Sequence, residues 1–408
     1  MRPLSIPLLS RNFLYAVLIL AALVDLPRRF NIGPLTGLAT LTMLCVLLPI
    51  LLGAADFRLL RTLPIEVTPL VVFLVWGFLS MSWNAPTIAG AQSLLVPAVF
   101  ILLVSLAYHH TKHHAGFTER LLKLLAFASR LAVVLYALSV LVGGLESNIL
   151  FSARSFALSS LLFLAWHLAN WRYGVRTGLY WAFFTTATVG LSLSRTALAT
   201  GLLFYPLARM SLKNRWGLLG VLLIGGLLAF GLYQAIYFFE PLRARFLEGD
   251  TSMSIGGIAI NATGRMTIWQ AILTSFLESP LIGKGIGASE GVVAMAAPGL
   301  GLPHCDYLRL LHDLGLIGLG AWILGQGSLL VATCRAWIRA DRQGTRLAPL
   351  HLTAFLGQLG VAFGMVTDNP LVYIFLMAPL GIIVGASLGA RTLDRPQPSQ
   401  REALPCAS

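Results

Sequence analysis

The sequence has few charged side chains, and this scarcity is its most informative feature. Only 11% of the 408 residues are Asp, Glu, Lys or Arg, whereas 57% are hydrophobic. Soluble domains carry about 25% charged residues, so the composition excludes a water-soluble globular fold. It is the composition of a polytopic membrane protein.

Acidic residues are scarcer than basic ones, 16 against 29, and the formal net charge is +13. A nucleic-acid-binding protein would gather its basic residues on one soluble face. Here they lie in short segments between apolar runs, as the positive-inside rule predicts for cytoplasmic loops. Membrane lipids are therefore expected partners, and nucleic acid is not.

Patterns for metals and disulfides are also missing. The four cysteines show no metal-ligand spacing and no paired framework. No Asp-x-Asp pair occurs, which argues against an enzyme that holds Mg²⁺ and a nucleotide sugar through such a pair. We interpret "HHTKHH" at 109–114 as a basic anchor, and "GKGIG" at 283–287 as a turn after Pro280, because no Ser or Thr follows its lysine. We expect no metal and no cofactor.

Apolar runs long enough to cross a hydrocarbon core of about 30 Å recur along the chain. They predict an all-α fold of about twelve transmembrane helices in one membrane domain, 1–408. The expected spans are 12–26, 36–54, 66–83, 92–108, 121–143, 155–170, 177–194, 196–211, 216–238, 307–333, 349–367 and 371–389. The first run lacks a convincing cleavage site and is expected to remain as a helix.

Basic residues in alternate loops predict the orientation. With a cytoplasmic N-terminus, the inner loops hold most of the Lys and Arg, whereas "SWNAPTIAG", "GGLESN" and "TDNP" on the outside hold none. Arg28 and Arg29 are the clear exceptions. Both termini are therefore expected to be cytoplasmic.

One outer connection, 239–306, is much longer than the others. Long loops in compact proteins are usually functional. Within this one, "GRMTIWQAILTSFLES" places apolar residues at helical spacing, and Pro280 follows it. We expect an amphipathic helix near the outer membrane surface.

Three cationic or titratable residues fall on the outer side: Arg195, Arg265 and His304. Separately, they could be a snorkelling arginine, a loop arginine near lipid phosphate and an interfacial histidine. Together they suit an anionic substrate, because guanidinium groups bind phosphate oxygens in pairs and a neutral histidine can take a proton from a hydroxyl. This combination fits a reaction in which a sugar leaves a lipid diphosphate and is attacked by an alcohol.

Three stretches, "SLSRTAL", "GRMTIWQAI…SPLIGKGIG" and "PHCDYLRLLHDLGLIGLG", resemble the O-antigen ligase and polymerase superfamily of bacterial membranes. The most specific pattern is His304, then Cys305, nine further residues, and Gly315-x-x-Gly318; Cys305 stands where the family usually has Asn, Ser or Gln.

The resemblance implies an inverting, metal-independent glycosyltransferase of the bacterial inner membrane with a periplasmic active site. Its donor would be an undecaprenyl-diphosphate-linked glycan, and its acceptor lipid A–core or a second lipid-linked glycan. By position, Arg195 and Arg265 match the arginines that contact the diphosphate, and His304 matches the essential histidine.

Other polar residues near these motifs have open roles. Asp306 could orient His304, Arg309 could pair with Asp313, and His312 is a second candidate base. Arg154 and Asp368 also fall outside and are further candidates for substrate contact.

The sequence leaves the choice between ligase and polymerase open. A transporter of lipid-linked oligosaccharides is the alternative class, although paired halves with broken helices are typical of transporters and none is visible. A structural membrane scaffold is a third reading.

Overall fold

The computed structural model describes residues 6–21, 46–54, 63–84, 88–149, 152–210, 216–247, 253–255, 258–260, 265–391 and 393. Arg28 and Arg29, the exceptions to the predicted charge pattern, lie outside this part of the chain.

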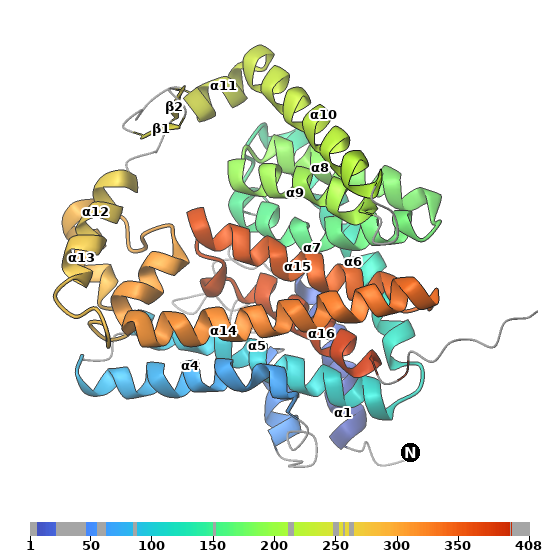
Figure 1. The fold of residues 1–408 in the computed structure, drawn as a ribbon, viewed down its shortest axis with the longest axis horizontal. Helices are drawn as coiled ribbons and strands as arrows, with labels where there is room; N and C mark the ends of the chain where they lie inside the picture. Colours follow the sequence, from blue (N-terminus) through green and yellow to red (C-terminus); the bar gives the residue numbers. More distant parts are fainter. Residues whose placement is uncertain are drawn as a thin grey trace, which may run out of the picture.

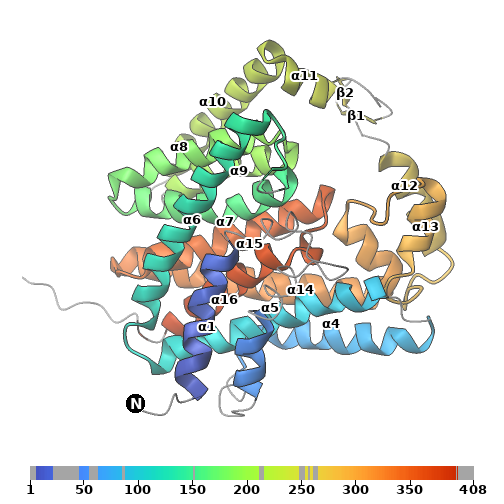
Figure 2. The same ribbon diagram turned by 180° about the vertical axis from the view of Figure 1, so that it is seen from behind.

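The described residues are helical almost throughout (Figures 1 and 2). The α-helices are α1 (Ile6–Ala21), α4 (Thr68–Leu79), α5 (Ile88–His113), α6 (Phe117–Gly143), α7 (Ala153–Arg172), α8 (Arg176–Leu191), α9 (Arg195–Arg209), α10 (Trp216–Phe238), α11 (Glu240–Leu247), α12 (Arg265–Phe276), α13 (Ser289–Ala296), α14 (Asp306–Gln343), α15 (Ala348–Thr367) and α16 (Ile374–Ala390). The 3₁₀ turns are η2 (Ile65–Val67), η3 (Ser80–Ser82) and η4 (Pro370–Val372). Two short strands, β1 (Met253–Ile255) and β2 (Ile258–Ile260), form an antiparallel pair.

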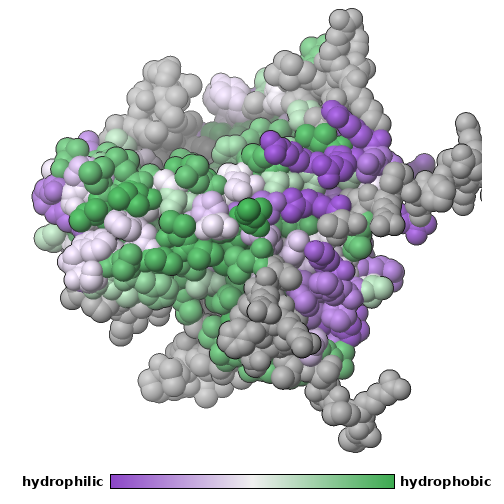
Figure 3. All heavy atoms as spheres, turned by 60° about the horizontal axis from the view of Figure 1, so that its bottom comes forward, coloured by the Kyte–Doolittle hydropathy of each residue, from purple (hydrophilic) through white to green (hydrophobic). Residues whose placement is uncertain are grey.

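Several helices are long and apolar enough to cross a membrane. Within the described residues there are five: Ile65–Ser82, Ser93–His113, Phe117–Gly143, Asp306–Gln343 and Ala348–Thr367. The chain is thus a multi-pass helical membrane protein, and the number twelve stays a prediction. Figure 3 shows hydrophobic surface across the molecule, with hydrophilic side chains gathered mainly toward the right, where α14 and α16 end in Figure 1.

α5 and α16 lie in close contact along a row of glycines. Gly381, Gly385 and Gly389 recur every four residues on α16, and each faces a backbone carbonyl of α5. A Cβ at Gly385 would overlap the carbonyl of Val104. Small residues at this spacing let membrane helices approach until their backbones touch.

α7 is the central helix. Nearly all of its side chains are buried, and it packs against α8, α9 and α15. Each of its ends holds an arginine, Arg154 in the first turn and Arg172 as the last residue.

The predicted span 307–333 is not one continuous helix. Gly315 has φ 67° and ψ −170°, which breaks α14 after its first turns. Segment 280–287 closes the break: Lys284 N–H and Gly285 N–H donate to the carbonyls of His312 and Asp313, at 3.0 and 2.8 Å. The expected turn after Pro280 is thus built against the break. Past the apolar run, α14 continues to Gln343 through a stretch rich in arginine.

The long connection 239–306 is largely structured. The amphipathic helix expected after residue 264 is confirmed as α12. Its buried residues Ile268 and Ile272 pack with Val293 of α13 and Leu308 of α14. α10 and α11 lead away from α9 along the top of Figure 1 and return through β1 and β2 to α12.

Candidate active site

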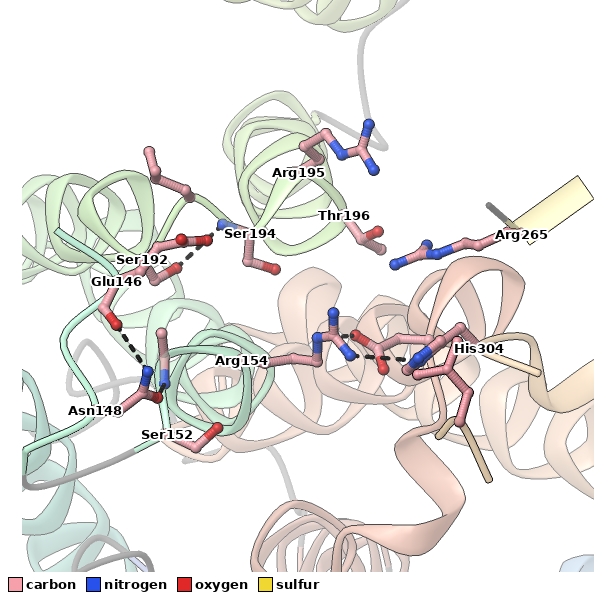
Figure 4. A pocket seen from close by; sticks show the side chains of 14 residues that line it. Glu146, Asn148, Ser152, Arg154, Ser192, Ser194, Arg195, Thr196, Arg265 and His304 are labelled. Atoms are coloured by element: carbon pink, nitrogen blue, oxygen red, sulfur yellow. Dashed lines mark hydrogen bonds and ion pairs between the residues drawn. The ribbon is translucent and has the colours of Figure 1, made fainter. Parts of the chain in front are cut away.

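A cavity of about 460 Å³ lies where several helices begin or end. α7, α9 and α12 begin there, α8 and α15 end there, and the segment before α14 completes the wall. Its lining residues are Glu146, Asn148, Ser152, Ala153, Arg154, Ser192, Leu193, Ser194, Arg195, Thr196, Arg265, Leu300, His304 and Asp368 (Figure 4).

The structure brings together the three residues that sequence reasoning ranked first. Arg195, Arg265 and His304 line this one cavity, although 109 positions separate the first from the last. Arg154 and Asp368, the two outer residues treated as auxiliary candidates, line it as well.

The cavity's guanidinium groups all belong to first turns of helices. Arg195 and Arg265 are the first residues of α9 and α12, and Arg154 is the second of α7. The N-terminal end of a helix carries a partial positive charge that disfavours cations. Helix stability therefore does not explain these arginines, whereas an anion would be attracted by both the guanidinium groups and the helix ends.

Unusual backbone conformations gather at the same cavity. Among the described residues other than glycine, positive φ angles occur at Glu146 (53°), Leu193 (52°) and His304 (54°), and all three line it. Such conformations cost about 1–3 kcal/mol each and cluster at functional sites. This local strain marks the cavity independently of its charge.

His304 is held by two nitrogen donors. Its Nδ1 lies 3.2 Å from the amide nitrogen of Asn369 and 3.4 Å from a guanidinium nitrogen of Arg154. Because an arginine can only donate, Nδ1 is the acceptor and the neutral ring carries its proton on Nε2. Nε2 makes no hydrogen bond within the described part of the chain.

Burial, reinforced by the positive charges of Arg154 and Arg265, lowers the pKa of His304 to about 4. The imidazole is therefore neutral at pH 7. It can offer a hydrogen bond to a hydroxyl or a phosphate oxygen without adding a full charge.

Asp368 is the carboxylate partner of Arg154 in the cavity. It is 4% exposed, lies 3.6 Å from Nε of Arg154, and accepts a 2.8 Å hydrogen bond from the backbone N–H of Asn369. Burial raises the pKa of its carboxyl group, while Arg154 opposes this shift. Arg265 donates a 2.8 Å bond to the carbonyl of Thr367, the residue before Asp368. The end of α15 thus positions both Arg154 and Arg265.

Asp306 does not orient His304. It is fully buried, pairs with Arg309 at 2.8 Å, and accepts a 2.8 Å bond from the backbone N–H of Leu371. The expected Arg309–Asp313 pair is also wrong, because Arg309 is turned toward Asp306. Positions 306 and 309 face each other across one helical turn, so both serve the packing of α14 on the segment after Asp368.

His312 is likewise outside the cavity lining. Its ring contacts Ser275 at 3.0 Å and the carboxylate of Asp313 at 2.9 Å. Asp313 also accepts from the backbone of Gly287 and from the backbone and hydroxyl of Ser289. This network fastens the segment before α13 to the break in α14, which explains the polar residues at the start of an apolar helix.

The segment 287–291, "GASEG", has the G-x-S-x-G pattern of a hydrolase nucleophile. Ser289 is 1% exposed and its hydroxyl donates to Asp313 rather than to a histidine. It begins α13 after a turn, and the described element that precedes α13 is the helix α12 rather than a strand. The serine is therefore a structural contact.

Sequence reasoning missed Glu146 and Ser194, which line the cavity, and Asn369, which contacts His304. Asn369 follows Asp368 in the outer segment "TDNP", and Glu146 lies in "GGLESN". Both segments were predicted to be outside, but nothing in the sequence places Asn369 beside His304 or Glu146 in the wall of the same cavity. No group of three or more His, Cys, Asp or Glu that could hold a metal occurs in the described ranges.

Fold and site together define a class: a multi-pass helical membrane protein with an anion-attracting cavity at one end of its helices. Residues 180–323 match a family model described as O-antigen ligase. The match confirms the predicted resemblance to the O-antigen ligase and polymerase superfamily over this part of the chain, which includes Arg195, Arg265 and His304. No curated protein matches the chain.

Proposed function

We propose that this protein transfers a glycan from undecaprenyl diphosphate to a hydroxyl group of an acceptor at the periplasmic face of the bacterial inner membrane. The observation that carries the proposal is the set of first-turn arginines, Arg154, Arg195 and Arg265, that share one cavity with a neutral histidine. The family match supports the reaction class.

The arginines suit the leaving group. In the proposed step, the acceptor oxygen bonds to the anomeric carbon from the side opposite the diphosphate, and the sugar–phosphate bond breaks. The diphosphate departs with the bonding electron pair, and the hydroxyl proton passes to it or to solvent. Guanidinium groups fixed beforehand around the diphosphate stabilise its developing charge. The configuration of the sugar is inverted.

His304 acts on the acceptor side. Because its Nδ1 is engaged by donors, the open Nε2–H donates a hydrogen bond that orients the acceptor oxygen. We assign it this orienting role rather than that of a base. By donating to Nδ1, Asn369 and Arg154 keep the imidazole neutral with its proton on Nε2.

The orientation of the chain follows from the charges at the two ends of the bundle. The cavity is at the end where α7 and α14 begin, and Arg172, Arg339 and Arg342 lie near the opposite ends of these helices. Since arginine-rich ends of membrane helices are typically cytoplasmic, we place the cavity outside and both termini inside.

The test uses purified protein in nanodiscs with a lipid-linked glycan and an acceptor. His304→Ala and Arg265→Ala should each lower the transfer rate by about 100-fold or more, and EDTA should change nothing. Full activity in either variant would refute the site. Loss of activity with EDTA, restored by a divalent cation, would refute the metal-independent mechanism.

Ligase and polymerase differ in the acceptor. A deletion strain that accumulates free lipid-linked polymer and lacks polymer on lipid A–core indicates a ligase. A strain that accumulates single lipid-linked repeats indicates a polymerase. In either case the arginine cavity holds the donor.

A further inference from the structure

The cavity has two chemically different halves (Figure 4). Arg154, Arg265 and His304 lie together on one side, with Arg195 above them; we call these four residues the cationic half. Glu146, Asn148, Ser152, Ser192 and Ser194 lie on the other side; we call these five the hydroxyl half. The hydroxyl half contains no arginine or lysine.

Two turns form the hydroxyl half, one between α6 and α7 and the other between α8 and α9, and a hydrogen bond joins them. The backbone N–H of Glu146, between α6 and α7, donates to the carbonyl of Leu191 at the end of α8. Asn148 braces the first turn by donating to the carbonyl of Glu146 and accepting from Ala153 N–H, at 3.0 and 3.1 Å. Ser192 braces the second through Val189. The positions of Glu146 and Ser194 are therefore set by surrounding bonds.

Ser194 is placed to contact a ligand. It immediately precedes α9, yet its hydroxyl does not cap that helix. The hydroxyl makes no other hydrogen bond to the described residues. A serine at this position normally accepts a hydrogen bond from a backbone N–H of the helix. Here the Ser194 hydroxyl can instead donate to or accept from a ligand in the cavity.

We propose that the hydroxyl half binds the sugar ring that is attached directly to the diphosphate, with Glu146 accepting hydrogen bonds from ring hydroxyls and Ser194 exchanging one with the same ring. This inference rests on the proposed function and adds a donor-sugar subsite to it. A carboxylate can accept from two neighbouring hydroxyls at once. Hydrogen bonds to a charged group are also the stronger ones.

Other occupants fit less well. A second phosphate would be repelled by Glu146 and would meet no cation in this half. A lipid tail would place hydrocarbon against the charge of Glu146 and would leave the hydroxyl of Ser194 without a hydrogen bond, which is costly. A neutral, hydroxyl-rich ring joined to a diphosphate matches both halves, and a cavity of about 460 Å³ is of the size of small-molecule sites.

The experiment compares two probes in nanodiscs: undecaprenyl diphosphate, and the same lipid bearing the glycan, extracted from a strain that lacks the gene. The variants are Glu146→Gly and Ser194→Ala. Glycine is chosen because it favours the positive φ of position 146. Glu119→Gln, on an exposed residue in the first turn of α6, is the matched control.

We expect each cavity variant to bind the glycan-bearing lipid about 10-fold more weakly, with binding of the sugar-free lipid unchanged. The control should bind both probes like the wild type. Equal weakening for both lipids, unchanged binding of the glycan-bearing lipid, or an effect on the KM of the acceptor alone would each overturn the subsite.

Arg265→Ala separates this inference from the proposed function. It should weaken both probes, since both carry the diphosphate. If it does so while Glu146→Gly and Ser194→Ala bind like the wild type, the subsite is wrong and the proposed function stands. If Arg265→Ala weakens neither probe, the proposed function itself fails.

Discussion

The two ends of α7 hold the same pair of side chains in different arrangements. At the end of the helix, Arg172 bonds Asp341 of α14 at 3.1 Å, and both side chains are almost fully buried. At its start, Arg154 lies 3.6 Å from Asp368, and its side chain is 38% exposed. One pair is closed, and the other remains open to the cavity.

The partners around the closed pair complete it. Arg172 also donates to the carbonyls of Ala208 and Met210, at 2.7 and 3.0 Å, and its guanidinium group lies over the Trp337 ring. Tyr173 donates a 2.8 Å bond to Asp341. A cation in the last turn of a helix is also favoured by the helix dipole. Every feature of this end increases stability.

The open pair lacks these advantages. Arg154 is in a first turn, where the dipole disfavours it, and its two contacts are long. A half-exposed guanidinium group with long contacts retains the capacity to bind an anion in the cavity. The comparison teaches how to read an arginine–aspartate pair in this membrane protein. A short, buried pair with all its hydrogen bonds made has a structural role, and a long, half-exposed pair indicates a functional one.

The largest expected effect comes from the histidines at the two ends. His304→Ala should lower the transfer rate by about 10²–10³-fold, as loss of one oriented donor does in other enzymes. His351→Ala, which removes the buried histidine bonded to Ser387 at the other end, should keep the wild-type rate per folded molecule. Rates measured in nanodiscs check both.

Because alanine is strained at a φ of 54°, His304→Asn is made alongside. An active His304→Asn variant would show that the alanine variant fails through its backbone, and would remove His304 from the mechanism.

The arginine pair gives the next effect. Arg154→Gln should lower the transfer rate about 10²-fold with an unchanged melting temperature. Arg172→Gln should keep the rate per folded molecule and cost about 3 kcal/mol of stability, since it leaves a buried carboxylate unpaired. Thermal unfolding and transfer assays on both variants test the contrast, and the reverse pattern would contradict it.

Substitution of Gly315, at the break in α14, should have a smaller effect, and the quantity affected is stability. Gly315→Ala places a Cβ against the carbonyl of Leu281 at a φ of 67°, and we expect a loss of about 1–3 kcal/mol. Gly320→Ala, in the same helix but facing open space, should be neutral or slightly stabilising. Equal melting temperatures for the two variants would contradict the non-helical conformation of Gly315 within α14.

The smallest effect is a shift in the pH profile. Since the pKa of His304 is about 4, transfer should stay constant as the pH falls from 7 and decline only near that value. Arg154→Gln removes a nearby positive charge from both His304 and Asp368, so the inflection should move to higher pH. An unchanged inflection would show that Arg154 does not act on the site.

The same pKa has a consequence for folding with a defined sign. An unfolded chain binds the histidine proton near pH 6.5, whereas the folded protein resists it until about pH 4. The contribution of His304 to stability is therefore complete above pH 6.5 and is lost as the pH falls toward 4. His304→Asn should lack this part of the acid sensitivity.

Hydropathy and charge predicted much of the fold. The helices expected at 155–170, 177–194, 196–211 and 349–367 correspond within a few residues to α7, α8, α9 and α15. These helices follow from local composition, because a lipid environment requires long apolar segments with internally bonded backbones. The break at Gly315 was not predicted, because it depends on segment 280–287 lying against α14.

Of the candidate site, the sequence indicated the residue types that line the cavity, and their outer side of the membrane stays a prediction. It assigned wrong partners to Asp306 and Arg309, since spacing along a helix says which residues are neighbours and not which distant segment occupies the space beside them. Asp306 instead bonds Leu371, 65 positions away. The role of Asn369 beside His304 is a similar long-range contact.

The sequence by itself determined that the chain enters a membrane as apolar helices, which short connections between them carry charge, and which motifs it shares with a family. Those properties depend on composition and short spacing. Only the tertiary structure decided that five helix ends from α7 to α15 meet, that Arg154 joins the cationic residues, and that the described residues on one side of the cavity include no cation. Their physical cause is packing between helices distant in the chain, which no local pattern encodes.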